Sequence, residues 1–271
     1  MSVTEQEAYI QELASVNTDW IDLLFRTAVS TNHYLSFSGG SEKNTYYVSF
    51  GYSKDNGAVK KTDYDRYNLS GKIDANPNKH LHFQLGFDMA MQNSTGPSTD
   101  PFSYAYFANP YERPFNEDGS YRADYTYYKL PKVNGSYDPT IPPNGFNMLR
   151  EMNETESKTD NFSITSRFNL DYSFFKQLKF SGLASYSFTN NKSDNYKGKD
   201  TYAAFVDRLY FDTWGNSSRT YSSISQSNTN NSSYSLRGQL SYSDVYREIH
   251  RFSVLAGAEI RGEKAEGIFE K

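Results

Sequence analysis

The sequence predicts an all-β protein whose antiparallel strands form part of the wall of a transmembrane β-barrel. Three features of its 271 residues predict this fold class. Apolar and polar residues alternate through most of the chain, as in strands with one apolar face. The connections between these segments alternate between short and long along the chain. Aromatic residues make up 17% of the chain, with 24 Tyr and 19 Phe, which excludes a Leu-rich helical bundle.

Helical patterning is confined to the beginning of the chain. Thr4 and Glu7 have the spacing of a capping box, so we expect a short helix over residues 5–14. A second helical turn is expected over residues 19–25. We therefore assign residues 1–29 to an extracellular loop segment that contains these short helices.

Eight segments between residues 30 and 261 alternate with a period of two. The clearest is 81–92, where every odd position is apolar and most even positions are polar or small. This pattern predicts strands with one apolar and one polar face. The expected strands cover residues 31–38, 45–53, 66–75, 81–92, 162–172, 178–189, 233–242 and 251–261.

The two longest connections cover residues 93–161 and 190–232. Soluble domains seldom contain two such loops, whereas outer-membrane barrels have tight periplasmic turns and long extracellular loops. The polar face then lines the lumen, because the opposite orientation would place Arg167 in lipid at a cost of about 2–4 kcal/mol. Residues 262–271 are expected to begin the next extracellular loop. A soluble antiparallel β-sandwich also alternates, so periodicity alone leaves it open.

The order of the connections predicts that this chain is an internal segment of a larger barrel. Short and long connections alternate so that both chain ends fall on the extracellular side, whereas a complete barrel of this type begins and ends in the periplasm. Residues 1–7 also lack the basic and apolar regions of a signal peptide. A self-contained eight-stranded barrel is the alternative.

Four stretches of sequence are more specific than simple alternation. They are TDWIDLLFRTA at 18–28; the hairpin LSFSGGSEKNTYY at 35–47, continued at 64–76; the loop NPYERPFNEDGSY at 109–121; and residues 167–180 with 236–261. Together they resemble the SusC/RagA family of TonB-dependent outer-membrane transporters. The likeness covers most of residues 18–261.

The resemblance implies a barrel of 22 strands with an N-terminal plug and a TonB box. It also implies a SusD-like lipoprotein lid, which captures oligosaccharides or peptides, and a location in a Bacteroidota-type Gram-negative outer membrane. The plug, the TonB box and the remaining strands are absent from this sequence. Contact with TonB would therefore run through the missing N-terminal part, and residues 30–261 would supply about eight wall strands.

Catalysis and metal binding have little support in the residue types. The chain has no cysteine, and it contains no nucleophile or phosphate-binding motif. His80 and His82 lie two residues apart on one strand face, but no third ligand is evident, so a turn histidine is favoured over a metal pair. The net charge of −4 argues against binding to nucleic acid, which is itself strongly negative. We expect no enzyme activity, cofactor, metal or nucleic-acid partner.

Aromatic side chains in the two long loops are the candidate binding residues. Flat rings stack on sugars and also anchor protein interfaces, so substrate contact and lid contact both stay open. An equal expectation is that these rings pack the loops onto one another and onto the barrel rim. The candidate substrate or lid contacts are Tyr104, Tyr106, Phe107, Tyr111, Tyr121, Tyr125, Tyr127, Tyr128, Tyr202, Tyr210, Phe211 and Trp214.

The predicted function is a part in a TonB-dependent outer-membrane importer of oligosaccharides or peptides. It would work with a SusD-like lipoprotein and be surrounded by outer-membrane lipid. A self-contained eight-stranded adhesin or structural barrel and a soluble glycan-binding β-sandwich are the alternatives. Solubility of the isolated chain without detergent would favour the sandwich.

Overall fold

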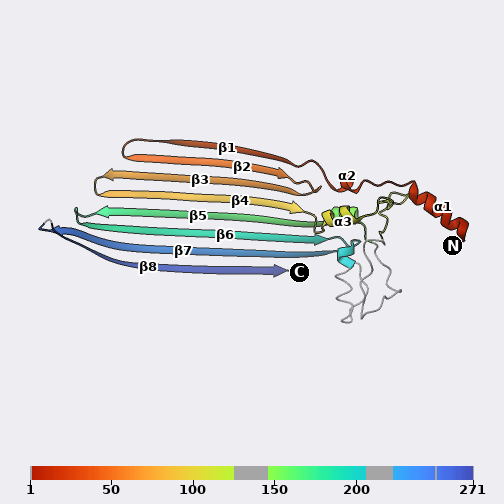
Figure 1. Cartoon of the computed structure of the whole chain (residues 1–271). Helices are drawn as coiled ribbons and strands as arrows, with labels where there is room; N and C mark the ends of the chain where they lie inside the picture. Colours follow the sequence, from red (N-terminus) through yellow and green to blue (C-terminus); the bar gives the residue numbers. More distant parts are fainter. Residues whose placement is uncertain (1, 125–145, 206–221, 248, 271) are drawn as a thin grey trace, which may run out of the picture.

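A computed structural model of the chain describes residues 2–124, 146–205, 222–247 and 249–270. Eight antiparallel strands pair in sequence order in one sheet, and short helices gather at one end of it (Figure 1). The strands are β1 (Val29–Gly40), β2 (Asn44–Asn56), β3 (Asp63–Asn78), β4 (Leu81–Gly96), β5 (Thr155–Ser173), β6 (Leu178–Lys197), β7 (Ser223–Tyr246) and β8 (His250–Glu270). The helices are α1 (Val3–Ala14), α2 (Trp20–Leu24), α3 (Pro101–Phe107) and α4 (Met148–Glu154). In the described ranges no helix is long and apolar enough to cross a membrane.

The eight predicted strands are confirmed, and each is longer than expected. β7 begins at Ser223, ten residues before the predicted start at 233, and β8 continues to Glu270 through residues expected to begin a loop. Residues 223–232 contain only one large apolar side chain, so a period-two pattern cannot be detected there. Their strand conformation follows instead from ladder pairing with β6 and β8.

The register brings the apolar side chains of neighbouring strands onto one side of the sheet. Leu69, Met89 and Ile164 occupy one row across β3, β4 and β5. The Phe87 ring lies over Gly71, directly opposite in β3, where an added Cβ would collide with the ring. Such cross-strand pairs stabilise a sheet. We call this side the apolar face.

The other side of the sheet carries most of its charged and amide side chains. Asp74, Gln84 and Asn169 stand in one row across β3, β4 and β5, and the row continues through β6 to Arg237 in β7. We call this side the polar face. The division between the two faces confirms the alternation predicted from the sequence.

The two ends of the sheet differ in the length of their connections (Figure 1). The described part of the short-turn end consists of residues 41–43, 79–80, 174–177, 247 and 249. Gly40 enters the first of these turns with a φ of 155°, and a Cβ there would overlap the carbonyl oxygen of Asn44. The described part of the long-loop end consists of α1, α2 and residues 57–62, 97–124, 146–154, 198–205 and 222.

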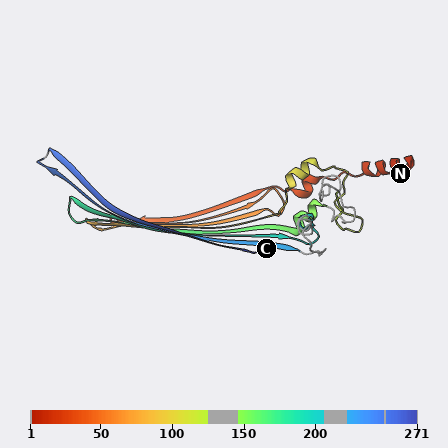
Figure 2. The ribbon, with the colours of Figure 1, turned by 90° about the horizontal axis from the view of Figure 1, so that it is seen from below.

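The sheet is open and twisted. In the described part of the chain β1 and β8 do not pair with each other, so no closed eight-stranded barrel forms. Figure 2 shows a single strongly twisted layer with no second sheet against it. The two-sheet sandwich, which periodicity alone left open, is therefore wrong.

The first helix begins earlier than its predicted cap. Ser2 is the N-cap of α1: its Oγ accepts the Glu5 N–H, and the Glu5 carboxylate accepts the Ser2 N–H at 2.6 Å. The capping box predicted at Thr4 and Glu7 is wrong because the same spacing occurs two positions earlier. The second predicted helical turn corresponds to α2.

Candidate functional site

The long-loop end is organised around an apolar cluster. We use the name long-loop cap for α2, α3, α4, the helical turn at 202–205 and the described connecting residues 57–62, 97–100, 108–124, 146–147 and 198–201. The rings of Trp20 and Tyr104 meet edge to face, with centroids 5.0 Å apart, and Phe146 packs against Tyr104 at 5.5 Å. The buried members of the cluster are Trp20, Leu24, Val59, Tyr104, Phe146, Met148 and Met152.

A buried carboxylate joins the two long loops. Glu151 in α4 is 2% exposed, and its oxygens accept the N–H groups of Tyr202 at 2.6 Å and Ala203 at 3.1 Å. Burial raises the pKa of the Glu151 carboxyl, and these two hydrogen bonds act in the opposite direction. Glu151 therefore fastens the start of the helical turn at 202–205 to α4.

Asn147 and Arg150 attach the same helix to the segment 114–122. The side-chain amide of Asn147 donates to two backbone carbonyl oxygens of that segment at 2.7 Å each. Its Oδ1 accepts the Arg150 N–H at 2.9 Å and so caps α4. The Arg150 guanidinium donates to the Asp200 carbonyl at 3.0 Å and lies over the Tyr121 ring, 5.2 Å from its centroid.

Three of the predicted contact residues pack within the long-loop cap. Tyr104 is 1% exposed, and its hydroxyl donates to Oδ2 of Asp124 at 2.8 Å. Tyr202 is half-buried against Phe146, with ring centroids 5.7 Å apart. Tyr121 lies beneath the Arg150 guanidinium. These three rings hold the loops together, which is the packing role that the sequence left open.

Three other predicted residues are exposed. Tyr106 is 83% exposed and Phe107 67% exposed, and their rings meet edge to face at 5.0 Å. Tyr111 is exposed to a smaller degree. Phe102, which was not among the predicted contacts, is also exposed and stands one helical turn before Tyr106. Its i, i+4 spacing is the signal that could have identified it. We call Phe102, Tyr106 and Phe107 the α3 patch.

The remaining predicted contacts cannot be placed. They are Tyr125, Tyr127, Tyr128, Tyr210, Phe211 and Trp214, and they lie outside the described residues. Among the described residues, the candidate surface at the long-loop end therefore consists of the α3 patch and Tyr111.

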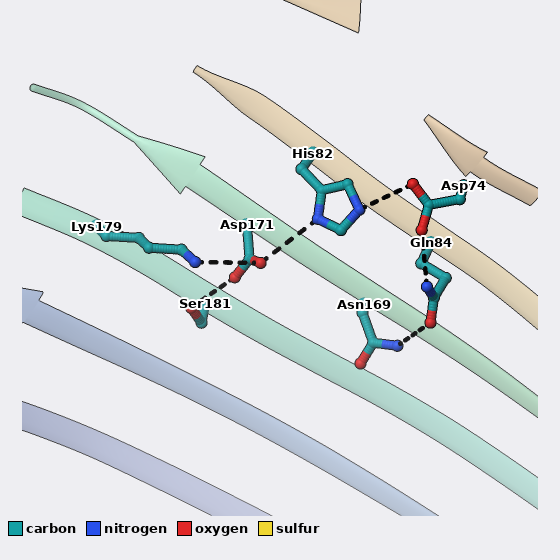
Figure 3. A network of polar contacts seen from close by, with 7 residues as sticks. All are labelled: Asp74, His82, Gln84, Asn169, Asp171, Lys179 and Ser181. Atoms are coloured by element: carbon teal, nitrogen blue, oxygen red, sulfur yellow. Dashed lines mark hydrogen bonds and ion pairs between the residues drawn. The ribbon is translucent and has the colours of Figure 1, made fainter. Parts of the chain in front are cut away.

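A second group of polar side chains lies on the polar face near the short-turn end (Figure 3). His82 stands between two carboxylates: its Nε2 is 3.1 Å from Oδ1 of Asp74, and its Nδ1 is 3.5 Å from Oδ2 of Asp171. Asp171 also accepts the Ser181 hydroxyl at 2.6 Å and pairs with the Lys179 ammonium at 3.2 Å. This network links β3, β4, β5 and β6.

The two histidines predicted to share a strand face have different surroundings. His80 lies at the turn between β3 and β4, where its Nδ1 is 2.8 Å from the Ser173 carbonyl oxygen. His82 belongs to the network described above. Within the described ranges, no group of three His, Cys, Asp or Glu side chains is arranged to hold a metal ion.

Comparison with known proteins yields relatives of one kind, although no family model matches the sequence. The TonB-dependent receptor SusC of Bacteroides thetaiotaomicron is 49% identical over 59 residues, which are 22% of this chain and 6% of SusC. TonB-dependent receptor P26 of Formosa agariphila is 25% identical over 96% of this chain and 25% of its own length. The chain is similar to TonB-dependent receptors over most of its length. The resemblance seen in the sequence is thereby confirmed.

Solved structures agree with this assignment at the level of the fold. The RagAB peptide transporter matches 94% of this chain with a TM-score of 0.65 and 17% identity, and the match is 26% of that transporter chain. Its 'open-open' state matches with a TM-score of 0.66. The sheet therefore has the fold of part of a TonB-dependent barrel. The chain spans a quarter or less of the length of the curated relatives that it matches.

Proposed function

We propose that this SusC-like sequence forms part of the wall and outer loops of an outer-membrane importer. The observation that carries the proposal is the sheet itself. Eight successive antiparallel strands share one apolar and one polar face, with tight turns at one end and long connections at the other. That combination is typical of transmembrane barrels. The match of 94% of the chain to the RagAB peptide transporter supports it.

The two faces determine how the sheet is placed in this proposal. The apolar face contacts the lipid of a Bacteroidota-type outer membrane, and the polar face lines the lumen, because Arg167 and Asp171 would be costly in lipid. The long-loop end faces the outside of the cell and the short-turn end faces the periplasm. Residues 1–29 and the two long loops are then extracellular, and further strands pair with the free edges of β1 and β8.

The substrate in this proposal is an oligosaccharide or a peptide, captured beneath a SusD-like lipoprotein lid. The name of the RagAB peptide transporter favours the peptide. The α3 patch is the proposed contact surface, because exposed rings stack on sugars and anchor protein interfaces. TonB would act through a part of the receptor that lies outside this sequence. None of the residues has a catalytic role in the proposal.

Uptake by cells that carry the receptor gene tests this function. Fluorescent oligosaccharides and fluorescent peptides of matched size would be supplied to cells with the gene intact or deleted. We expect deletion to abolish uptake of one class, and dissipation of the proton-motive force to have the same effect on intact cells. If the deletion strain takes up each class as well as the intact strain does, the proposal is contradicted.

A double substitution tests the α3 patch separately. We expect Tyr106→Ala with Phe107→Ala to weaken binding of the substrate or of the lid lipoprotein by about tenfold or more, as for aromatic anchors of an interface. Barrel folding should be unchanged because both side chains are exposed. Tyr9→Ala is the matched control, since Tyr9 is an exposed aromatic of α1 outside the patch.

A further inference from the structure

The polar face of the sheet contains a hollow. It has a volume of about 380 Å³ and lies across four neighbouring strands, β4 to β7. The hollow adjoins the network drawn in Figure 3 and extends beyond it toward β7. Its lining residues include His82, Gln84, Asn169, Asp171, Arg237 and Gln239.

The acidic groups in and beside the hollow already have partners. Asp171 accepts the Ser181 hydroxyl at 2.6 Å and pairs with Lys179 at 3.2 Å. Asp74, next to the hollow, accepts the Gln84 amide at 2.9 Å and lies 3.1 Å from Nε2 of His82. A cationic ligand would therefore compete with contacts that already exist on this side.

On the opposite side of the hollow, in β7, lies the cationic side chain of Arg237. Among the described residues Arg237 makes no hydrogen bond and no ion pair. Glu259 stands directly across from it in β8, but the Glu259 carboxylate is bound by Arg261 and accepts the Ser235 hydroxyl at 3.2 Å. Gln239, the next lining residue along β7, also makes no side-chain hydrogen bond to the described residues. The free hydrogen-bond donors of the hollow therefore gather on β7.

We infer that this hollow binds a carboxylate group of a solute in the barrel lumen, held by the guanidinium of Arg237 with the amide of Gln239 beside it. A guanidinium presents a planar fork of N–H donors that matches the two oxygens of a carboxylate. A neutral sugar or amide would leave the guanidinium of Arg237 without a direct ion-pair partner among the described residues, because the Glu259 carboxylate is bound by Arg261. The inference rests on the proposed importer function, because that function places the polar face on the solute path.

Peptide binding to the purified receptor tests the inference. The full-length receptor that contains this sequence would be titrated in detergent with triglutamate and with triglutamine, both acetylated at the N-terminus and amidated at the C-terminus. The glutamate side chains are then the only carboxylates, and the two peptides differ in charge but not in length. We expect triglutamate to bind at least tenfold more tightly, and Arg237→Gln to remove that preference. Arg237→Lys should keep only part of it, because an ammonium cannot form the paired contact.

The matched control is Arg66→Gln. Arg66 also points to the polar face, but its Nε donates to Asn68 at 3.0 Å and it lies outside the hollow. This variant should keep the full preference for triglutamate. If Arg237→Gln does not fold, Arg237→Lys decides the question, and an unchanged preference in Arg237→Lys would overturn the paired contact.

Two other outcomes would overturn the inference. The first is equal binding of both peptides by the unsubstituted receptor. The second is a lower Tm of Arg237→Gln with peptide binding unchanged, because Arg237 would then pair with an acidic side chain elsewhere in the receptor. Since the readout is binding by purified protein, failure here is distinguishable from failure of the uptake experiment, which tests the importer function in cells.

Discussion

Tyr104 and Tyr106 show that the surroundings of a residue decide whether its side chain is buried or exposed. Both are tyrosines of α3, and both were candidate contacts on sequence grounds. They lie two positions apart, so they project from opposite sides of the helix. Tyr104 is 1% exposed and Tyr106 is 83% exposed. The sequence could not separate them, because α3 has only seven residues and its buried side is defined by α2 and by residues distant in sequence.

Removing the hydroxyl group from each tyrosine tests this difference. Tyr104→Phe loses the hydrogen bond to the buried Asp124 carboxylate, so we expect the long-loop cap to lose about 1–3 kcal/mol of local stability. Tyr106→Phe should change the local stability of the cap by less than about 0.5 kcal/mol, since the Tyr106 side chain is exposed. Hydrogen exchange of the cap amides measures both. Equal effects of the two substitutions would contradict the assigned packing.

The raised pKa of Glu151 predicts a pH dependence of the same cap. The folded cap binds a proton at Glu151 more tightly than the unfolded chain does, whose carboxyl has its ordinary pKa of 4.5. The free energy of unfolding of the cap therefore falls as the pH rises from 4.5 through the raised value. Hydrogen exchange at residues 201–205, corrected for intrinsic rates, should show this slope. Glu151→Gln should abolish it, and a stability that rises through this pH window would contradict the account.

At the scale of elements, alternation predicted all eight strands but not their full lengths. Residues 81–92 alternate so strictly that the strand is evident, and the structure extends it only to Gly96. Residues 223–232 and 262–270 have no such pattern, and they are strands because neighbouring strands supply hydrogen-bond partners. Pairing of this kind is a tertiary effect, which local sequence does not encode.

The opposite faces of β4 predict opposite responses to an added charge. Met89→Arg places a guanidinium on the apolar face near the middle of the strand, and we expect it to destabilise the membrane-inserted receptor by about 2–4 kcal/mol. Ala90→Arg places the same group on the polar face beside Asn68 and should be tolerated. The fraction of receptor that stays folded in increasing urea, followed by its shift on unheated gels, distinguishes them. Equal loss in both variants would contradict the assignment of the faces.

At the scale of the whole molecule, composition and the order of connections predicted the fold class, whereas the long-loop cap could not be predicted. α3 and α4 have seven residues each, too few to be stable alone. They depend on contacts such as Glu151 with Tyr202, which join residues 51 positions apart. Such contacts leave no periodic signal, so the sequence named the aromatic candidates without showing which of them face outward.

Cysteine accessibility in intact cells tests the orientation of the sheet most directly. This sequence has no cysteine, so Glu117→Cys in the first long loop and Lys176→Cys in the turn between β5 and β6 each add one thiol to it. Both side chains are exposed. We predict that a membrane-impermeant maleimide labels Cys at 117 in intact cells, and labels Cys at 176 only after the outer membrane is permeabilised. Labelling at 176 but not at 117 in intact cells, or labelling of both only after lysis, would contradict the account.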